Sequence, residues 1–175
     1  MPKRELIEAA DQLPRSTIAT RVVRHISPGY LALSGEGARV HGGRWNPPDS
    51  FAVLYTASDR ATMMSELDRA ARRQGLHAVD LLPRDEVIYA VELQRVLDLT
   101  DPLSLERVGL DAPLLAAANW SPCQAIGDAA HYVGFEAVLA PSATGSGQTL
   151  AIFLDRLLRG SILEVSSVTP LELDS

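Results

Sequence analysis

Residues 33–66 read LSGEGARVHGGRWNPPDSFAVLYTASDRATMMSE, and they combine a glycine-rich loop, an apolar strand and the start of a helix. The glycines allow sharp turns or a close approach of the backbone to another group. Arg44 and Trp45 follow them directly, so a cation and a large ring stand at the end of the loop. The Asn-Pro-Pro turn at residues 46–48 stiffens the exit from the loop. Residues 51–55 (FAVLY) predict a buried strand.

The segment after this strand predicts a helix that carries a carboxylate at the edge of its apolar face. Ser58 is a candidate N-cap for a helix beginning near Asp59. Apolar residues recur at helical spacing: Met63, Leu67, Ala70 and Ala71. Glu66 falls beside them and is expected to be half-buried. By position alone it is either a functional carboxylate or a border glutamate that pairs with Arg69 or Arg73.

Further helices and strands are expected on both sides of this stretch. The predicted helices cover residues 4–13, 102–108 and 114–118, and a longer one starts at residues 120–122, with Ser121 as cap and Pro122 as first helical residue. The predicted strands cover residues 20–26, 87–93, 96–99, 136–140, 149–154 and 162–168. This order lacks the βαβ regularity of a parallel sheet. It predicts a single-domain α+β fold with a mixed, mostly antiparallel sheet.

Composition limits the possible functions. The chain has 175 residues, 16 Lys and Arg, 22 Asp and Glu, and a net charge of -6, which argues against a general nucleic-acid binder. Its single cysteine, Cys123, excludes an intramolecular disulfide and a cysteine-rich zinc site. His131 has no second ligand at a metal-binding spacing, so no metal is expected. Without an apolar signal segment or a run of membrane-spanning length, the expected location is the cytoplasm.

Several polar residues at strand ends and in loops are candidates for ligand contact. Arg24 and His25 end a strand just before a Ser-Pro-Gly turn, where an arginine can reach a phosphate or can simply be a surface residue. Ser142 lies in a loop of small residues after a strand, which suits ligand contact or an ordinary turn. Nothing around it resembles a nucleophile elbow, so it is not interpreted as a hydrolase serine. Gln124 lies on the more polar side of its helix and is a further candidate.

Four motifs in order resemble the RES domain family, which is named for an arginine, a glutamate and a serine. They are GGRWN at 42–46, LYTAS at 54–58 with Glu66 eleven residues after Tyr55, WSPCQAIGDAA at 120–130, and VLAPSA at 138–143. The resemblance covers about residues 21–167, and LSGEGAR…GGRWNPP is similar to the actinobacterial toxin members. It implies an N-terminal helix or arm at 1–18, the domain at 19–168 and an acidic tail at 169–175.

The resemblance implies the toxin of a type II toxin–antitoxin pair, which degrades NAD+ by phosphorolysis or hydrolysis of the nicotinamide–ribose bond. It also implies a fold similar to ADP-ribosyltransferases, NAD+ as substrate, no separate cofactor, and inorganic phosphate as a possible co-substrate. The implied partner is a helical antitoxin with an Xre-type DNA-binding domain that blocks the active site. The toxin would contact neither DNA nor membrane directly, and it could form homo-oligomers or hetero-oligomers with the antitoxin.

The residues that match the family's functional positions are Arg44, Glu66 and Tyr55 as catalytic residues, and Arg24 and Ser142 as substrate contacts. Trp45, Gln124 and His25 are further candidate substrate contacts. His25 stands where relatives often carry tyrosine. The chemistry is consistent, because nicotinamide leaves as a neutral molecule and needs no general acid. A carboxylate such as Glu66 can stabilise the positive charge that develops on the ribose. Arginines suit the phosphates of NAD+.

Two other functions stay open at this stage. The same site could transfer ADP-ribose to a cellular target, as an ADP-ribosyltransferase does. Alternatively, the chain could be a partner-binding subunit that kept the fold and lost turnover. The matches at Arg44, Tyr55, Glu66 and Ser142 argue against the second alternative.

Overall fold

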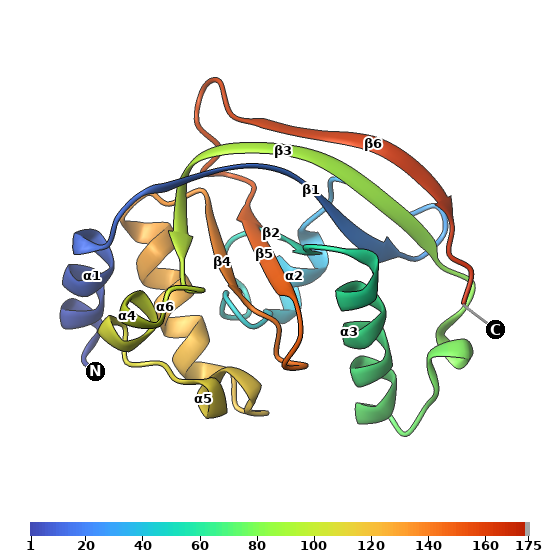
Figure 1. Ribbon diagram of the computed structural model, residues 1–175, viewed down its shortest axis with the longest axis horizontal. Helices are drawn as coiled ribbons and strands as arrows, with labels where there is room; N and C mark the ends of the chain where they lie inside the picture. The colour runs from blue at the N-terminus through green and yellow to red at the C-terminus, as the bar shows by residue number, and fades with distance from the viewer. Residues whose placement is uncertain (174–175) are drawn as a thin grey trace.

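Six strands form one mixed sheet in the computed structural model, which describes residues 1–173 (Figure 1). They are β1 (Ser16–Ile26), β2 (Val53–Ala57), β3 (Asp85–Asp98), β4 (Ala137–Pro141), β5 (Gln148–Phe153) and β6 (Ile162–Pro170). Their order is β1-β2-β5-β4-β3-β6, and β1 also pairs with β3. Among these described strands, the β3–β4 pairing is parallel and the others are antiparallel. The predicted α+β fold with a mixed, mostly antiparallel sheet is confirmed.

The sheet folds over itself as two layers with an apolar core between them. β1, β3 and β6 form the long upper layer in Figure 1, and β2, β5 and β4 lie below it. The end of β3 leaves the upper layer and pairs with β4, from Val96 opposite Ala137 to Asp98 opposite Leu139. The core between the layers contains, among others, Val22, Leu54, Tyr89, Val91, Leu150 and Ile152. One face of β2 and β5 is therefore covered by the chain's own sheet.

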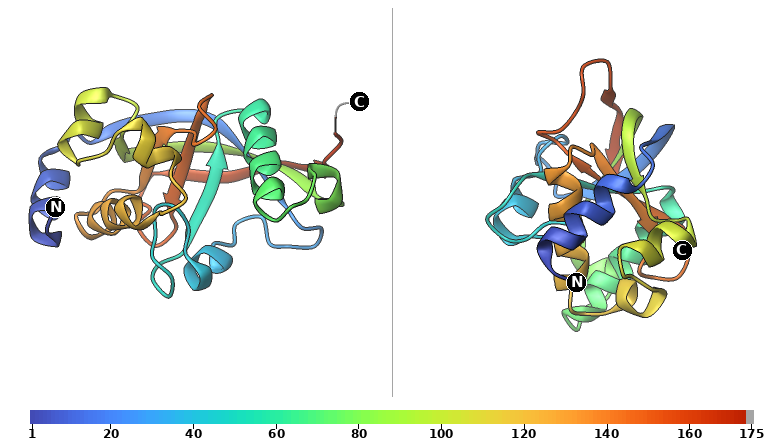
Figure 2. Two further views of the ribbon diagram at one scale, coloured as in Figure 1. Left: turned by 90° about the horizontal axis from the view of Figure 1, so that it is seen from below. Right: turned by 90° about the vertical axis from the view of Figure 1, so that its left-hand side faces the viewer.

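The helices lie below the upper layer of the sheet in Figure 1 and pack around the lower layer (Figures 1 and 2). They are α1 (Lys3–Gln12), α2 (Glu36–His41), α3 (Arg60–Arg73), α4 (Pro102–Arg107), α5 (Ala112–Ala116) and α6 (Ser121–Tyr132), with a 3-10 helix η1 (Ala78–Leu81). α1 and α6 lie side by side and bury a large apolar cluster against β4 and β5. α3 packs Met63 and Leu67 against Val23 of β1 and Ala57 of β2.

One predicted break between strands and one predicted loop were wrong in the first hundred residues. The strands expected at 87–93 and 96–99 are one strand, β3. Glu136 explains the continuity, because its Oε2 accepts the backbone N–H groups of Gln94 and Arg95 at 2.7 and 2.9 Å and keeps that segment extended. The glycine-rich segment expected to be a loop contains the short helix α2.

Both predicted N-caps were also wrong, each by one residue. Asp59 caps α3 in place of Ser58, because its Oδ1 accepts the Thr62 N–H at 2.7 Å. Ser121 is the first residue of α6, and its N–H is accepted by Asn119 Oδ1 at 3.0 Å. Pro122 is consequently the second helical residue.

The segment expected to be a C-terminal tail begins as part of the sheet. β6 runs to Pro170, and Leu171 is 6% exposed in the cluster beneath α3. Asp174 and Ser175, the end of the expected tail, lie outside the described residues. Within residues 1–173, no helix has the length and apolar character needed to cross a membrane.

Candidate active site

Glu66 and Ser142 meet where α3 faces the loop after β4. Ser142 Oγ donates a hydrogen bond to Glu66 Oε1 at 2.6 Å, and Ser142 is 4% exposed. Thr144 supports the serine, with its Oγ1 at 2.8 Å and its backbone N at 3.1 Å from Ser142 Oγ. No salt bridge in the described part of the chain joins Glu66 to Arg69 or Arg73. The carboxylate is therefore oriented by a hydroxyl, and the alternative of a paired border glutamate is not what the structure contains.

Three arginines gather beside this carboxylate. Arg69 donates to the carbonyl oxygen of Ala143, and its Nη2 donates to Ala116 O at 2.7 Å. Arg44 donates to the carbonyl oxygen of Leu115. The guanidinium groups of Arg44 and Arg73 both lie over the Trp120 ring, each 5.6 Å from its centroid. Such stacking suits the weakly hydrated, planar guanidinium group.

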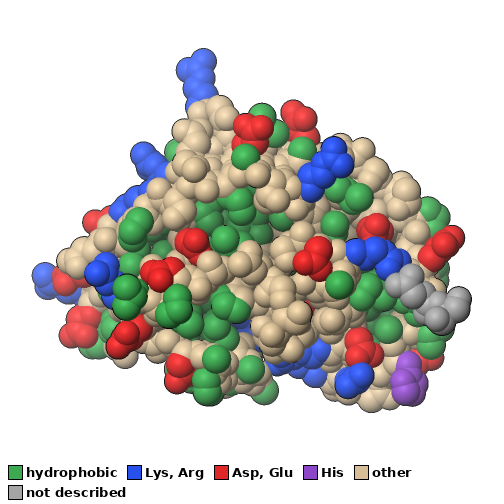
Figure 3. Space-filling model, viewed as in Figure 1, with side chains coloured by type: hydrophobic (Ala, Val, Ile, Leu, Met, Phe, Trp, Pro, Cys, Tyr) green, Lys and Arg blue, Asp and Glu red, His purple; other side chains and the backbone are tan. Residues whose placement is uncertain are grey.

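The charges in this group are not balanced. Arg73 is in electrostatic range of Arg69, Arg44 and Glu66. Burial, followed by the charges of Arg69 and Arg44, lowers the pKa of Arg73, and Glu66 partly offsets this. Three cations and one carboxylate leave a local positive charge on a chain whose net charge is -6. Lys and Arg side chains are visible at the lower edge of Figure 3, between the positions that α5 and α3 occupy in Figure 1.

Tyr55 holds the loop that carries Arg44. Its hydroxyl donates to Asn46 Oδ1 and accepts the Trp45 N–H, each at 2.8 Å. Burial raises the pKa of Tyr55, so the phenol stays neutral. Gln124 Nε2 donates to Gly43 O at 2.9 Å, which fixes the same loop from α6. Tyr55 and Gln124 were expected at the substrate, and in this structure their polar atoms bond to the residues around Arg44.

Trp45 was expected to contact the substrate, and the structure corrects this prediction. Its side chain is 1% exposed and belongs to the core under α6. Gly127 of α6 permits this position, because a Cβ there would lie 1.8 Å from Trp45 O. Sequence patterns indicated a ring presented by a flexible loop, but the loop is anchored. The Trp45 ring is therefore part of the apolar core. The indole that faces the arginines is that of Trp120.

Arg24 and His25 occupy opposite faces of β1, since side chains alternate along a strand. Arg24 Nη1 donates to Ser34 O at 2.9 Å, and the side chain lies beside Tyr89. His25 Nδ1 is buried without a described hydrogen-bond partner. Burial, followed by the charges of Arg84 and Arg24, lowers the pKa of His25 to about 4. No described interaction joins either residue to Glu66, so the structure does not bring them into the Glu66 group.

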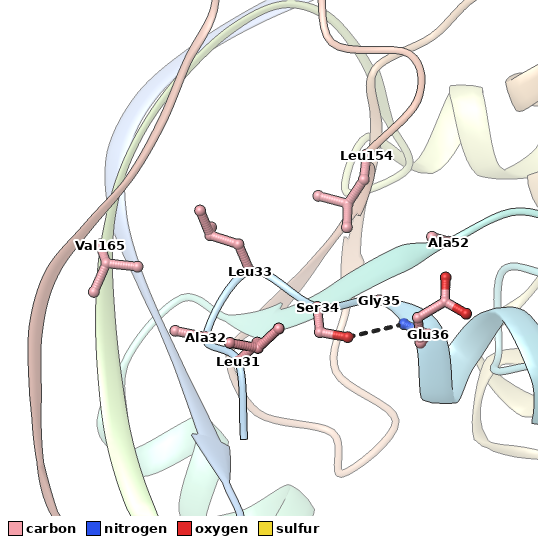
Figure 4. Close-up of a pocket in the computed structure, with 9 residues that line it drawn as sticks. All are labelled: Leu31, Ala32, Leu33, Ser34, Gly35, Glu36, Ala52, Leu154 and Val165. Carbon is pink, nitrogen blue, oxygen red and sulfur yellow. Dashed lines mark hydrogen bonds between the residues drawn. The ribbon is translucent and has the colours of Figure 1, made fainter. Parts of the chain in front are cut away.

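A separate hollow of about 540 Å³ is lined in part by Ser34, whose carbonyl oxygen accepts the hydrogen bond from Arg24 (Figure 4). It is lined by residues 31–36 together with Ala52, Leu154 and Val165. Most of these side chains are apolar, and none belongs to the group around Glu66. Among the residues that line this hollow, Glu36 is the one carboxylate, and it is exposed and paired with Arg39.

Sequence reasoning considered Arg69 and Arg73 only as structural partners of Glu66, and it passed over Trp120 and Thr144. One signal could have revealed the arginines. Positions 66, 69 and 73 are spaced i, i+3 and i+7, so they lie on one face of a helix. Trp120 and Thr144 carry no comparable local signal, because their place depends on the tertiary fold. Within residues 1–173, no three His, Cys, Asp or Glu side chains are grouped to hold a metal ion.

Comparison with known proteins gives a consistent set of relatives. The profile of the RES domain matches residues 18–173. The NAD(+) phosphorylase MbcT of Mycobacterium tuberculosis (strain ATCC 25618 / H37Rv) is 38% identical over 133 residues, covering 75% of this chain and 72% of the relative. The probable NAD(+) phosphorylase Rv3189 of the same strain is 35% identical over 116 residues, covering 66% and 55%. In the crystal structure of the M. tuberculosis MbcT–MbcA toxin–antitoxin complex, one chain matches with a TM-score of 0.86 and 32% identity, over 95% of this chain and 92% of that one.

Proposed function

The chain belongs to the RES domain family, and on this premise we propose that it is a toxin that cleaves the nicotinamide–ribose bond of NAD+. Two relatives carry the name NAD(+) phosphorylase, and a matched structure is a toxin–antitoxin complex. One observation on this chain's own residues supports the proposal most directly. Glu66 is held by Ser142 in a group that also contains Arg44, Arg69 and Arg73.

In this proposal Glu66 stabilises the ribose as its bond to nicotinamide breaks. The electron pair of that bond moves to the ring nitrogen, so nicotinamide departs neutral and takes no proton from the enzyme. Positive charge develops on the ribose, and a preoriented carboxylate stabilises it more strongly than mobile water would. Ser142 supports this role as a donor to the carboxylate, and Arg44 supplies a cation for the phosphates of NAD+.

We propose Tyr55 and Gln124 as positioning residues for the loop that carries Arg44. Their hydrogen bonds end on Asn46, Trp45 and Gly43, which supports this role. Arg24, which matches a position of the family, and its neighbour His25 remain proposed substrate contacts. They could act there only if NAD+ extended from the Glu66 group to β1. No separate cofactor is proposed.

A second part of the proposal concerns the partner. A toxin of this kind acts in the cytoplasm and is inhibited by a cognate antitoxin, which we expect to be a helical protein with an Xre-type DNA-binding domain. An inhibitor must cover the arginines that receive the substrate, so the partner should lie over Arg44. A complex with Arg44 still open to solvent would contradict this arrangement.

The experiment that tests the function uses purified protein and NAD+, with and without inorganic phosphate, with products separated by mass. ADP-ribose 1″-phosphate formed only with phosphate identifies a phosphorylase, and ADP-ribose in both samples identifies a glycohydrolase. If NAD+ is stable unless a protein acceptor is added and labelled, the chain is an ADP-ribosyltransferase. Folded, antitoxin-free protein that leaves NAD+ intact in every sample would overturn the proposal.

A further inference from the structure

One peptide group lies between the side chains of Arg69 and Ser142. It consists of the carbonyl of Ala143 and the N–H of Thr144. Arg69 Nη1 donates to the Ala143 oxygen, and the Thr144 N–H donates to Ser142 Oγ, with 3.1 Å between the two heavy atoms. Because a peptide group is planar, the bond that holds its oxygen also restricts the direction of its N–H. Arg69 therefore helps to fix the direction from which Ser142 Oγ accepts a hydrogen bond.

The hydroxyl of Ser142 connects this peptide group to Glu66. An ionised carboxylate can only accept hydrogen bonds, so the single proton of Ser142 is donated to Glu66 Oε1, 2.6 Å away. The N–H of Thr144 then donates to the serine oxygen. Hydrogen bonds arranged in a chain polarise one another. The described contacts thus form one chain of hydrogen bonds from the guanidinium of Arg69 to the carboxylate of Glu66.

A second hydrogen bond fixes the guanidinium itself. Arg69 Nη2 donates to Ala116 O at 2.7 Å, and Ala116 is the last residue of α5. The last carbonyl groups of a helix have no partner within it, so they are available as acceptors for an arginine. Two donors of one planar group, bound to two segments, restrict the rotation of that group. A lysine has no such planar pair of donors.

Arg69 and Glu66 do not form an ion pair, although they are three residues apart on α3 and share a helix face. The salt bridges found among residues 1–173 do not include this pair. The shortest described connection between the two side chains therefore runs through Ala143, Thr144 and Ser142.

We propose that Arg69 is a positioning residue for Glu66, which it orients through the Ala143–Thr144 peptide group and Ser142. This inference rests on the proposed function and adds one residue to it. With Arg69 in place, the carboxylate is aligned before NAD+ arrives and can stabilise the positive charge on the ribose. Without Arg69 the peptide group can rotate, and Ser142 loses its fixed donor. The change affects the transition state more than the binding of NAD+, so it lowers kcat and leaves KM nearly constant.

A direct contact with a substrate is the competing role for Arg69. A guanidinium has five N–H donors, and the two described hydrogen bonds leave others for an anionic group. Loss of such a contact would raise the KM for that substrate. Its effect would also be independent of Ser142. The two roles therefore differ in which kinetic constant changes and in whether the serine is required.

The test is a double-mutant cycle in the cleavage of NAD+ at one fixed concentration of inorganic phosphate. Arg69→Gln should lower kcat by about tenfold and change the KM for NAD+ by less than about twofold. Beside Ser142→Ala, which has no hydroxyl to orient, Arg69→Gln should lower kcat by less than about twofold. Arg69→Lys should show the same dependence on Ser142, and it replaces Arg69→Gln if that variant does not fold. Arg72→Gln is the matched control, since Arg72 lies on the same helix and pairs with Asp68 at 2.6 Å.

Three kinetic results would overturn the inference. They are a wild-type kcat in Arg69→Gln, losses that multiply in the double variant, and a rise of about tenfold in the KM for NAD+. A loss of kcat that disappears at higher phosphate concentration would assign Arg69 to that anion and overturn the inference as well. In all these cases wild type still cleaves NAD+, so the proposed function stands. Wild type that leaves NAD+ intact would overturn the proposed function and this inference with it.

Discussion

The hydroxyl of Ser142 donates a hydrogen bond to the Glu66 carboxylate, with 2.6 Å between Ser142 Oγ and Glu66 Oε1. The two residues are 76 positions apart in the chain, and the contact joins the end of β4 to α3. Hydrogen bonds to an ionised acceptor are stronger than neutral ones and restrict the acceptor's orientation. A carboxylate fixed before substrate arrives is the arrangement that stabilises a developing positive charge efficiently.

Replacing Glu66 by glutamine should abolish most NAD+ cleavage and preserve the fold. The amide retains the shape of the side chain but not its charge, so about 3 kcal/mol of transition-state stabilisation is lost, or about a hundredfold in kcat. Asp68→Asn is the control, because Asp68 lies on the same helix and pairs with Arg72. Product formation should fall only in Glu66→Gln, with both melting temperatures near wild type. Wild-type turnover by Glu66→Gln would remove Glu66 from the mechanism.

Replacing Ser142 by alanine should lower kcat by about tenfold without abolishing it. The lost hydrogen bond frees the carboxylate to adopt other orientations, at a cost of about 1.5 kcal/mol. Ser146→Ala, an exposed position in the same loop, should leave kcat unchanged. Complete loss of turnover in folded Ser142→Ala, or a covalent adduct on Ser142, would instead indicate a nucleophilic serine.

Replacing Tyr55 by phenylalanine should destabilise the protein. The change leaves the Trp45 N–H and the buried Asn46 Oδ1 without their described partner, which predicts a loss of about 1–3 kcal/mol in the free energy of unfolding. Urea denaturation of Tyr55→Phe and of the control Tyr132→Phe, at an exposed tyrosine, would measure this loss. Equal stability with a specific loss of kcat would show that the hydroxyl acts on the substrate instead.

Sequence patterns predicted the sheet better than they predicted the site. Apolar segments identified seven stretches of strand, two of which are parts of β3. The absence of βαβ regularity predicted the mostly antiparallel sheet. The continuous β3 was missed because Glu136, 41 residues beyond Arg95, accepts the N–H groups at the apparent break. The helix α2 was missed because glycines usually indicate a loop.

For the site, the family resemblance singled out Glu66 and Ser142, but local patterns could not show that they touch. Alternation along β1 implies that Arg24 and His25 point in opposite directions, yet it does not say which one faces which layer. Trp45 was misjudged because its burial depends on the close approach of Gly127, a tertiary contact. These features depend on contacts between residues far apart in the chain, and a local stretch of sequence does not contain that information.

Gly127→Ala tests that tertiary contact. A Cβ at position 127 would lie 1.8 Å from Trp45 O, a backbone atom that cannot move aside without shifting the loop of Arg44. The variant should lose about 3 kcal/mol or more of stability. Gly37→Ala in α2 is the control, because the nearest atom to its added Cβ is 3.7 Å away, and it should be neutral or slightly stabilising. Equal unfolding midpoints for the two variants would mean that the Trp45 backbone does not approach α6 this closely.

His25 should make the stability of the protein depend on pH on the acid side of neutrality. The pKa of His25 is lowered to about 4 in the folded protein by burial and by the charges of Arg84 and Arg24, from an ordinary value of 6.5. Between these two values the unfolded chain binds the proton more readily, so stability is complete above pH 6.5 and is lost as the pH falls towards 4. The full effect is about 3 kcal/mol.

The matched variants for this effect are His25→Gln and, at an exposed position in α2, His41→Gln. Urea midpoints of wild type and His41→Gln should decline together from about pH 6.5 to about pH 4. His25→Gln should lose a large part of that decline, because glutamine has no proton to gain, even if its stability at neutral pH is altered. An unchanged decline in His25→Gln would mean that His25 takes up its proton in the folded protein as readily as in the unfolded chain, and that other groups cause the acid sensitivity.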